Sequence, residues 1–122
     1  MEKNRTPIIK SFGYAIRGVL RLMKEERNAK IHAVAALSVI GAGFYFNINL
    51  LEWTMIVIAI ALVIITEAVN TVLENLLDHI HPERHPTVGK IKDMAAGAVL
   101  IAALAAFIIG LLVFLPKLYT LF

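Results

Sequence analysis

Residues 53–78 read WTMIVIAIALVIITEAVNTVLENLLD, and this stretch decides the fold. Its first thirteen residues, Trp53 to Ile65, carry no charge, whereas its second half contains Glu67, Glu74 and Asp78. With its extension from Leu50 to about Leu77, the uncharged run suits a helix that crosses a bilayer, which needs about 20 residues. A charged side chain near the bilayer centre is unfavourable by about 2.5 to 3.5 kcal/mol. The acidic residues must therefore face protein, water or a bound cation.

The composition of the whole chain supports an integral membrane protein. Of its 122 residues, 59% are hydrophobic and 17% are charged, and the mean hydropathy is +0.76. Soluble domains have about 25% charged residues. We expect a single all-α domain over residues 1–122, with the following parts: a surface helix at 8–27, spanning helices at 30–48, 51–78 and 92–116, and a polar loop at 79–91.

The basic residues predict the orientation of the chain. Eight of the twelve precede the first expected span or, as Lys30, begin it, and three more lie in or beside the loop at 79–91. Lys and Arg near the ends of spans remain on the cytoplasmic side, so the N-terminus and this loop are expected there. The basic residues have no interleaved aromatic platform, which favours the lipid bilayer over nucleic acid as the anionic partner.

The segment 8–26 has the pattern of an amphipathic helix in the membrane interface. Apolar residues such as Ile8 and Val19 fall on one side, and four basic residues fall opposite them: Lys10, Arg17, Arg21 and Lys24. This pattern suits a helix with its basic face toward water and anionic lipid. Glu26 projects onto the apolar side if the helix extends that far. A buried carboxylate needs a partner, for which a cation is suitable.

The polar residues after Ile65 form one stripe on the second expected span. Glu67, Asn70, Glu74 and Asp78 fall within about 80° of arc on a helix. Counted from Leu51 as the outer end, Glu67 lies about 24 Å into a hydrocarbon layer of about 30 Å, just inside the cytoplasmic boundary. Several acids on one face repel one another. The pattern therefore favours a cation-linked site over a purely structural stripe.

Phosphoryl transfer is one reaction that uses such residues. One carboxylate accepts a hydroxyl proton, others hold Mg²⁺ on nucleotide phosphates, and a basic residue balances the leaving charge. Lys92 and Asp93 begin the third expected span on the same side. The sequence has no Walker loop, since Gly89 and Lys90 are followed by Ile91. Two alternatives stay open: a small cation or proton transporter whose path the acids line, and an assembly subunit without activity.

Five segments of the chain carry a resemblance to a known family. They are EAVNTVLENLLD (67–78), ERH (83–85), KIKDMAAGAV (90–99), SFGYAIRG (11–18) and EERNAKIH (25–32). Together they resemble the small bacterial integral-membrane diacylglycerol kinases over most of the chain. The ERNxKIH form is similar to the Gram-positive branch of this family, whose members phosphorylate undecaprenol in preference to diacylglycerol.

The resemblance implies a function and a role for each matching residue. The expected reaction is ATP-dependent phosphorylation of a membrane lipid alcohol, undecaprenol or, alternatively, diacylglycerol, at the bacterial cytoplasmic membrane. Glu67 would be the general base with Asn70 beside it, and Glu26 and Glu74 would hold Mg²⁺. The residues lining the ATP site would be Tyr14, Glu26, Glu74, Glu83, Arg84, His85, Lys92 and Asp93.

The resemblance also implies a homotrimer whose active sites are shared between chains. In the family an arginine near the N-terminus contacts the nucleotide, but Pro7 stands at the matching position of this chain. Arg5 or Lys10 could take over this contact, and the sequence leaves the choice between them open.

Overall fold

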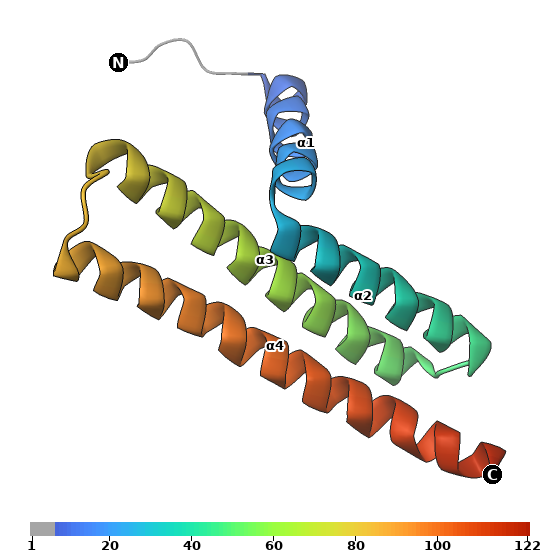
Figure 1. The fold of residues 1–122 in the computed structure, drawn as a ribbon. Coiled ribbons are helices and arrows are strands. Elements are labelled where there is room, and N and C mark those ends of the chain that lie inside the picture. Colours follow the sequence, from blue (N-terminus) through green and yellow to red (C-terminus); the bar gives the residue numbers. More distant parts are fainter. Residues whose placement is uncertain (1–6) are drawn as a thin grey trace.

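The computed structural model describes residues 7–122, and these residues form four α-helices. The helices are α1 (Ile8–Glu25), α2 (Arg27–Tyr45), α3 (Leu50–Ile80) and α4 (Pro86–Leu121). Figure 1 shows α2, α3 and α4 side by side in an elongated bundle, from which α1 projects at a steep angle. No strand occurs within the described residues, so the all-α expectation is confirmed.

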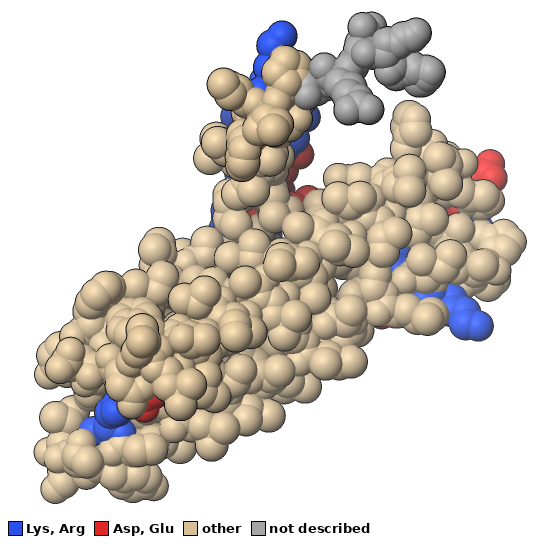
Figure 2. Space-filling model, turned by 180° about the vertical axis from the view of Figure 1, so that it is seen from behind, with Lys and Arg blue, Asp and Glu red and all other residues tan. Residues whose placement is uncertain are grey.

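The outer surface of the bundle is that of a membrane protein. Helices α3 and α4 are each long and apolar enough to cross a membrane. Large apolar side chains such as Ile58, Ile101 and Phe107 are exposed on them. Figure 2 shows broad uncharged flanks, with charged groups gathered on α1 and toward the ends of the bundle. In a bilayer, the exposed apolar side chains of the flanks would contact lipid chains.

Helix α1 has the amphipathic character that the sequence predicts, but it ends before the expected position. The expected surface helix extends to residue 27, whereas α1 ends at Glu25 and Glu26 separates it from α2. Glu26 is extended, with φ −104° and ψ 119°, and its N–H still donates to the carbonyl oxygen of Leu22 at 3.0 Å. None of the residues of α1 is buried, so little packing fixes this helix against the bundle.

A tight turn joins α2 to α3. The N–H of Asn47 donates to the carbonyl oxygen of Phe44 (3.3 Å), and that of Ile48 donates to the carbonyl oxygen of Gly43 (3.1 Å). These two bonds satisfy the last carbonyls of α2 in a Schellman motif. Asn47 has φ 53°, a left-handed conformation that asparagine tolerates better than most residues. The side chain of Asn49 then caps α3 by accepting from the N–H of Glu52 at 2.8 Å.

Gly43 is required for the close packing of this turn. A Cβ atom at position 43 would lie 2.6 Å from Cη2 of Trp53 and 3.1 Å from Cδ1 of Ile48. We therefore expect Gly43→Ala to be destabilising, with overpacking of about 1–3 kcal/mol offsetting the gain of about 0.5–1 kcal/mol in helix propensity. Gly41→Ala is the matched control, because nothing lies within 4 Å of its Cβ position. Melting in detergent should place Gly43→Ala below Gly41→Ala, and equal melting temperatures would contradict the steric argument.

Apolar packing and one ion pair hold α3 against α4 near this turn. Ile56 of α3, Val113 of α4 and Ile48 form the buried cluster, each with 4% or less of its surface exposed. Lys117 Nζ lies 3.2 Å from Glu52 Oε1, which joins the end of α4 to the start of α3.

Helix α4 continues past Pro116, where a span ending at 116 is expected. A proline removes a single N–H from the helical ladder, and the residues after it remain helical here.

The loop between α3 and α4 is shorter than the expected loop at 79–91. Helix α3 continues to Ile80 and α4 begins at Pro86. The physical reason is that Pro86 occupies the first position of the helix, where its missing N–H would have no helical partner. His85 caps the helix through its Nδ1 atom, which accepts from the N–H of Thr87 at 3.1 Å. Pro86 therefore begins a helix instead of extending the loop, whereas Pro82 lies within the loop.

Candidate active site

The buried face of α3 changes from apolar to polar along the helix. Its buried residues follow a spacing of three or four positions and then an adjacent pair: Ile56, Ala59, Val63, Glu67, Asn70 and Thr71. This spacing keeps all of them on one side of an α-helix. The face that packs the bundle thus continues directly into a polar segment, and Glu67 is where the change occurs.

Glu67 is almost completely enclosed and has His32 of α2 as its neighbour. Only 2% of the surface of Glu67 is exposed. Oε1 of Glu67 lies 3.6 Å from Nε2 of His32, an ion-pair distance that is too long for a hydrogen bond. Burying a carboxylate without a partner is costly, so the imidazole compensates for part of this burial.

Asn70 and Thr71 lie one turn further along α3 and have buried polar atoms without partners. Both residues are 7% exposed. Oδ1 of Asn70 and Oγ1 of Thr71 make no hydrogen bond within residues 7–122. Buried polar atoms in folded proteins are nearly always hydrogen-bonded to protein or water. Two unpaired oxygens beside a buried carboxylate therefore indicate a place where a polar ligand, a water or an ion completes the structure.

Glu26 and Glu74 bring two further carboxylates to this region. Glu26 lies at the joint between α1 and α2, and Glu74 lies on α3 one turn beyond Asn70; both are half-buried. Glu74 lies seven positions beyond Glu67, about 10 Å along α3. Glu26 lines the α1–α3 cavity together with Ala68, the residue after Glu67. The described residues contain no cluster of three or more potential metal ligands. Mg²⁺, however, is commonly held by one or two carboxylates with waters and phosphates, so the oxygen donors of Glu26, Glu74 and Asn70 fit this ion.

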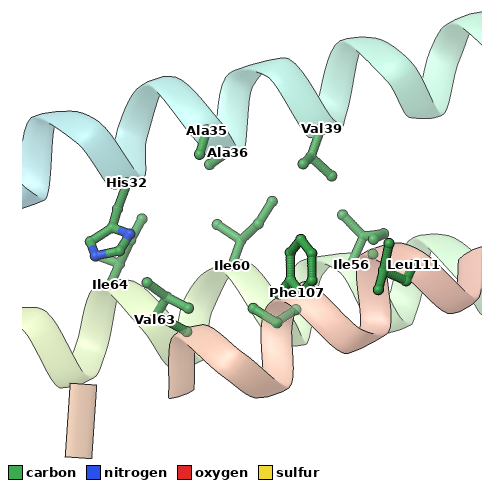
Figure 3. Close-up of a pocket in the computed structure, with 14 residues that line it drawn as sticks. His32, Ala35, Ala36, Val39, Ile56, Ile60, Val63, Ile64, Phe107 and Leu111 are labelled. Carbon is green, nitrogen blue, oxygen red and sulfur yellow. The ribbon is translucent and has the colours of Figure 1, made fainter. Parts of the chain in front are cut away.

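Two cavities, each of about 370 Å³, adjoin α3 on either side of Glu67 along the helix. The first, which we call the apolar cavity, lies between α2, α3 and α4, and its α3 lining extends from Ile56 to Ile64. In Figure 3 its walls are almost entirely aliphatic and aromatic, and His32 lies at one end. The second, the α1–α3 cavity, has an α3 lining that extends from Ala68 to Asn75 and includes Glu26 on the opposite wall. Glu67 lines neither cavity and lies between the two along α3.

The residues expected at the nucleotide site are mostly exposed. Tyr14 of α1 is 56% exposed, and the guanidinium carbon of Arg17 lies 5.0 Å from the centre of its ring. The other exposed members are Glu83, Arg84, His85 and Asp93. Ile80 lies thirteen positions beyond Glu67, about 20 Å along α3, so the loop after Ile80 is not brought to Glu67 within one chain.

Lys92 has a partner of its own. Its Nζ lies 2.5 Å from Oδ1 of Asp78, so the last acid of the stripe on α3 pairs with the first turns of α4. A phosphate group would have to compete with Asp78 for this ammonium.

Lys10, one of the two candidates for the additional nucleotide contact, is exposed on α1, whereas Arg5 lies outside the described residues.

His32 and Thr71 are the residues of this region that the motif analysis does not single out. His32 lies in a segment, 31–46, that is otherwise apolar apart from Ser38 and the hydroxyl of Tyr45. A lone histidine in a membrane segment is a usable signal, because ionisable residues there are rare and usually functional. Thr71 carries no such signal, since a threonine hydroxyl normally bonds to its own helix, as those of Thr54 and Thr66 do.

The fold and this region together define an all-helical membrane protein with a buried acidic centre on α3. The chain belongs to the prokaryotic diacylglycerol kinase family, since the family profile matches residues 13–114. It is 42% identical to undecaprenol kinase of Bacillus subtilis over 117 residues, covering 96% of this chain and 94% of that protein. It is 31% identical to diacylglycerol kinase of Escherichia coli K12 over 103 residues, covering 84% of each.

A third relative is a diacylglycerol kinase of Synechocystis, 36% identical over 93% of this chain and 66% of that protein. Membership of the family makes this protein a lipid kinase. A kinase of this type uses ATP as co-substrate and a lipid as acceptor.

Proposed function

We propose that the protein phosphorylates undecaprenol to undecaprenyl phosphate at the cytoplasmic face of the bacterial cell membrane, in the recycling of the cell-envelope lipid carrier. The substrate is suggested by the Bacillus subtilis relative, which is named for this lipid and matches nearly the whole chain. Diacylglycerol is the second candidate, because the relatives from Escherichia coli and Synechocystis are named for it.

The observation that carries the proposal is the position of Glu67 between the two cavities. The apolar cavity suits a lipid chain, and the lining of the α1–α3 cavity includes the polar residues Glu26, Thr71 and Asn75. The lipid hydroxyl would meet Glu67 from the apolar side and the phosphates of ATP from the other. Such an arrangement keeps the lipid in the bilayer while ATP enters from the cytosol.

In the proposed reaction, the lipid oxygen forms a bond to the γ-phosphorus of ATP while the bond from this phosphorus to the bridging oxygen breaks. ADP leaves, and the hydroxyl proton passes to the carboxylate of Glu67. Asn70 would position the reacting groups. Glu26 and Glu74 would hold Mg²⁺, which when bound offsets the negative charge of the phosphates.

The remaining residues would bind ATP. Tyr14, Glu83, Arg84, His85 and Asp93 would contact the nucleotide, and Lys92 would exchange Asp78 for a phosphate. The separation of the loop after Ile80 from Glu67 within one chain supports a homotrimer in which neighbouring chains complete each site.

The proposed topology has three spans and places the active site on the cytoplasmic side. Helix α2 is the third span, in addition to α3 and α4. Its first turn is basic, with Arg27 and Lys30, which shortens its apolar part to about sixteen residues. The excess of Lys and Arg on α1 and in the first turn of α2 supports a cytoplasmic N-terminus.

The test uses the purified protein in detergent with ATP labelled at the γ-phosphate. Undecaprenol and diacylglycerol are supplied separately, and label in the extracted lipid is counted. We expect label in undecaprenol with the higher kcat/KM. A preference for diacylglycerol would replace the substrate assignment with the second candidate, and no label in either lipid would remove the proposed function.

Narrowing the apolar cavity provides a test of where the lipid lies. Ala36 lines this cavity, so Ala36→Phe should raise the KM for undecaprenol about tenfold or more and leave the KM for ATP within about twofold. Leu37→Phe is the matched control, because Leu37 is 69% exposed and does not line the cavity. If the two variants have the same lipid KM, the chain of the substrate lies elsewhere.

A further inference from the structure

His32 connects the apolar cavity to the carboxylate of Glu67. Its side chain is 24% exposed and lines the end of the cavity, whereas that of Glu67 is 3% exposed and lies behind it. In Figure 3 the imidazole of His32 extends from α2 at one end of the cavity, near Ile64 and Val63 of α3. A lipid alcohol that occupies the cavity therefore reaches the histidine on its way to Glu67.

Glu67 needs a partner that fixes the direction of its carboxylate. On α3 the residues one turn before it, Val63 and Ile64, are apolar, and the hydroxyl of Thr71 one turn after it makes no hydrogen bond. The ring nitrogen of His32 is the group that the structure places beside Oε1, at 3.6 Å. A base that is oriented by a third group recurs in enzymes, because proton transfer depends steeply on geometry.

We propose that His32 is a positioning residue, which holds the carboxylate of Glu67 toward the end of the apolar cavity, where the lipid hydroxyl arrives. The inference rests on the proposed function, since it assigns a role within the same site. His32 does not take the proton itself: it acts through Glu67. Replacing it therefore lowers kcat and leaves the binding of ATP and lipid nearly unchanged.

Three variants test this role in the purified, detergent-solubilised protein. His32→Leu removes the ring nitrogens and should lower kcat with undecaprenol about 10- to 100-fold, with both KM values within about twofold of wild type. His32→Gln places an amide N–H near the position of Nε2. Its kcat should recover at least about a third of the loss seen in His32→Leu, when the loss is expressed as the logarithm of kcat. Ser38→Leu is the control, a polar-to-leucine change at an exposed position of the same helix that lines neither cavity.

A double-mutant cycle separates positioning from a structural role. In a Glu67→Gln background there is no carboxylate to position, so adding His32→Leu should change the residual turnover by less than about twofold. An unchanged kcat in His32→Leu would overturn the inference. A kcat of His32→Gln as low as that of His32→Leu would also overturn it, because the imidazole itself would then be the base. So would an equal fold-loss of kcat from His32→Leu in the wild-type and Glu67→Gln backgrounds.

The activity of the wild type separates failure of the proposed function from failure of the positioning role. Wild-type protein that labels no lipid would count against the proposed function, whereas an active wild type with an unaffected His32→Leu counts against the positioning role alone. Should His32→Leu fail to fold, His32→Met takes its place, because the flexible thioether chain adapts to irregular surroundings. Melting temperatures of all variants are measured beside turnover.

Discussion

Glu67→Gln should lower the turnover of undecaprenol about 10²- to 10⁴-fold, the usual contribution of a positioned general base. Glutamine keeps the size of the side chain and its hydrogen-bonding groups but cannot accept the hydroxyl proton. The same change removes a charge from a site that is 2% exposed inside a membrane helix. The melting temperature should therefore stay equal or rise slightly. Lipid phosphorylation and melting in detergent are measured on the same preparations.

Glu52→Gln is the matched control for this prediction. It makes the same substitution on the same helix, but Glu52 lies at the far end, where it pairs with Lys117 and caps α3. We expect it to lower the melting temperature modestly and to keep turnover near that of wild type. If Glu67→Gln retains more than about a tenth of wild-type turnover, Glu67 is not the base. If it loses activity because it melts early, the residue is structural.

Removing the proposed metal ligands should have the second large effect. Glu26→Ala and Glu74→Ala should each lower turnover at least about 10²-fold and raise the Mg²⁺ concentration needed for half-maximal activity. The protein should remain inserted, because both side chains are only half-buried and neither belongs to the apolar cluster of the bundle. The measurement is a Mg²⁺ titration of lipid phosphorylation at saturating ATP and lipid.

Glu52 supplies the control. Glu52→Ala also removes a glutamate, but Glu52 lies at the start of α3, pairs with Lys117 at 3.2 Å and lines neither cavity. Its Mg²⁺ dependence should match that of wild type. Wild-type dependence in Glu26→Ala and Glu74→Ala as well would remove both residues from the metal site.

Much of the fold is predictable because it depends on local patterns. The amphipathic period of residues 8–26, the uncharged run 53–65 and the apolar run after Met94 give three of the four helices. The ends of the helices are harder to predict, since they depend on single residues. Pro86 favours both a loop and the first turn of a helix, and His85 decides between the two by capping α4.

The site is predictable only in part, because its contacts join distant positions. The stripe from Glu67 to Asp78 is visible in the sequence, but its members differ in surroundings: Glu67 is enclosed, whereas Asp78 is exposed and pairs with Lys92. The pairing of His32 with Glu67 joins residues 35 positions apart on two helices. Helical periodicity places a residue on a face, but it does not tell which face of another helix lies opposite.

The ion pair with Lys117 fixes Glu52 at one end of the bundle, and the length of α3 from Glu52 to Glu67 is fixed as well. A continuous helix joins Glu52 to Glu67, and fifteen residues at 1.5 Å each make it a rigid spacer of about 22 Å. In a bilayer whose hydrocarbon layer is much thinner or thicker than this segment requires, one end of the segment would be mismatched with the layer. The protein would then tilt or deform the surrounding lipid. We therefore expect the thickness of the host membrane to set how deep the carboxylate of Glu67 lies relative to the lipid headgroups, so that turnover differs between lipids of different chain length.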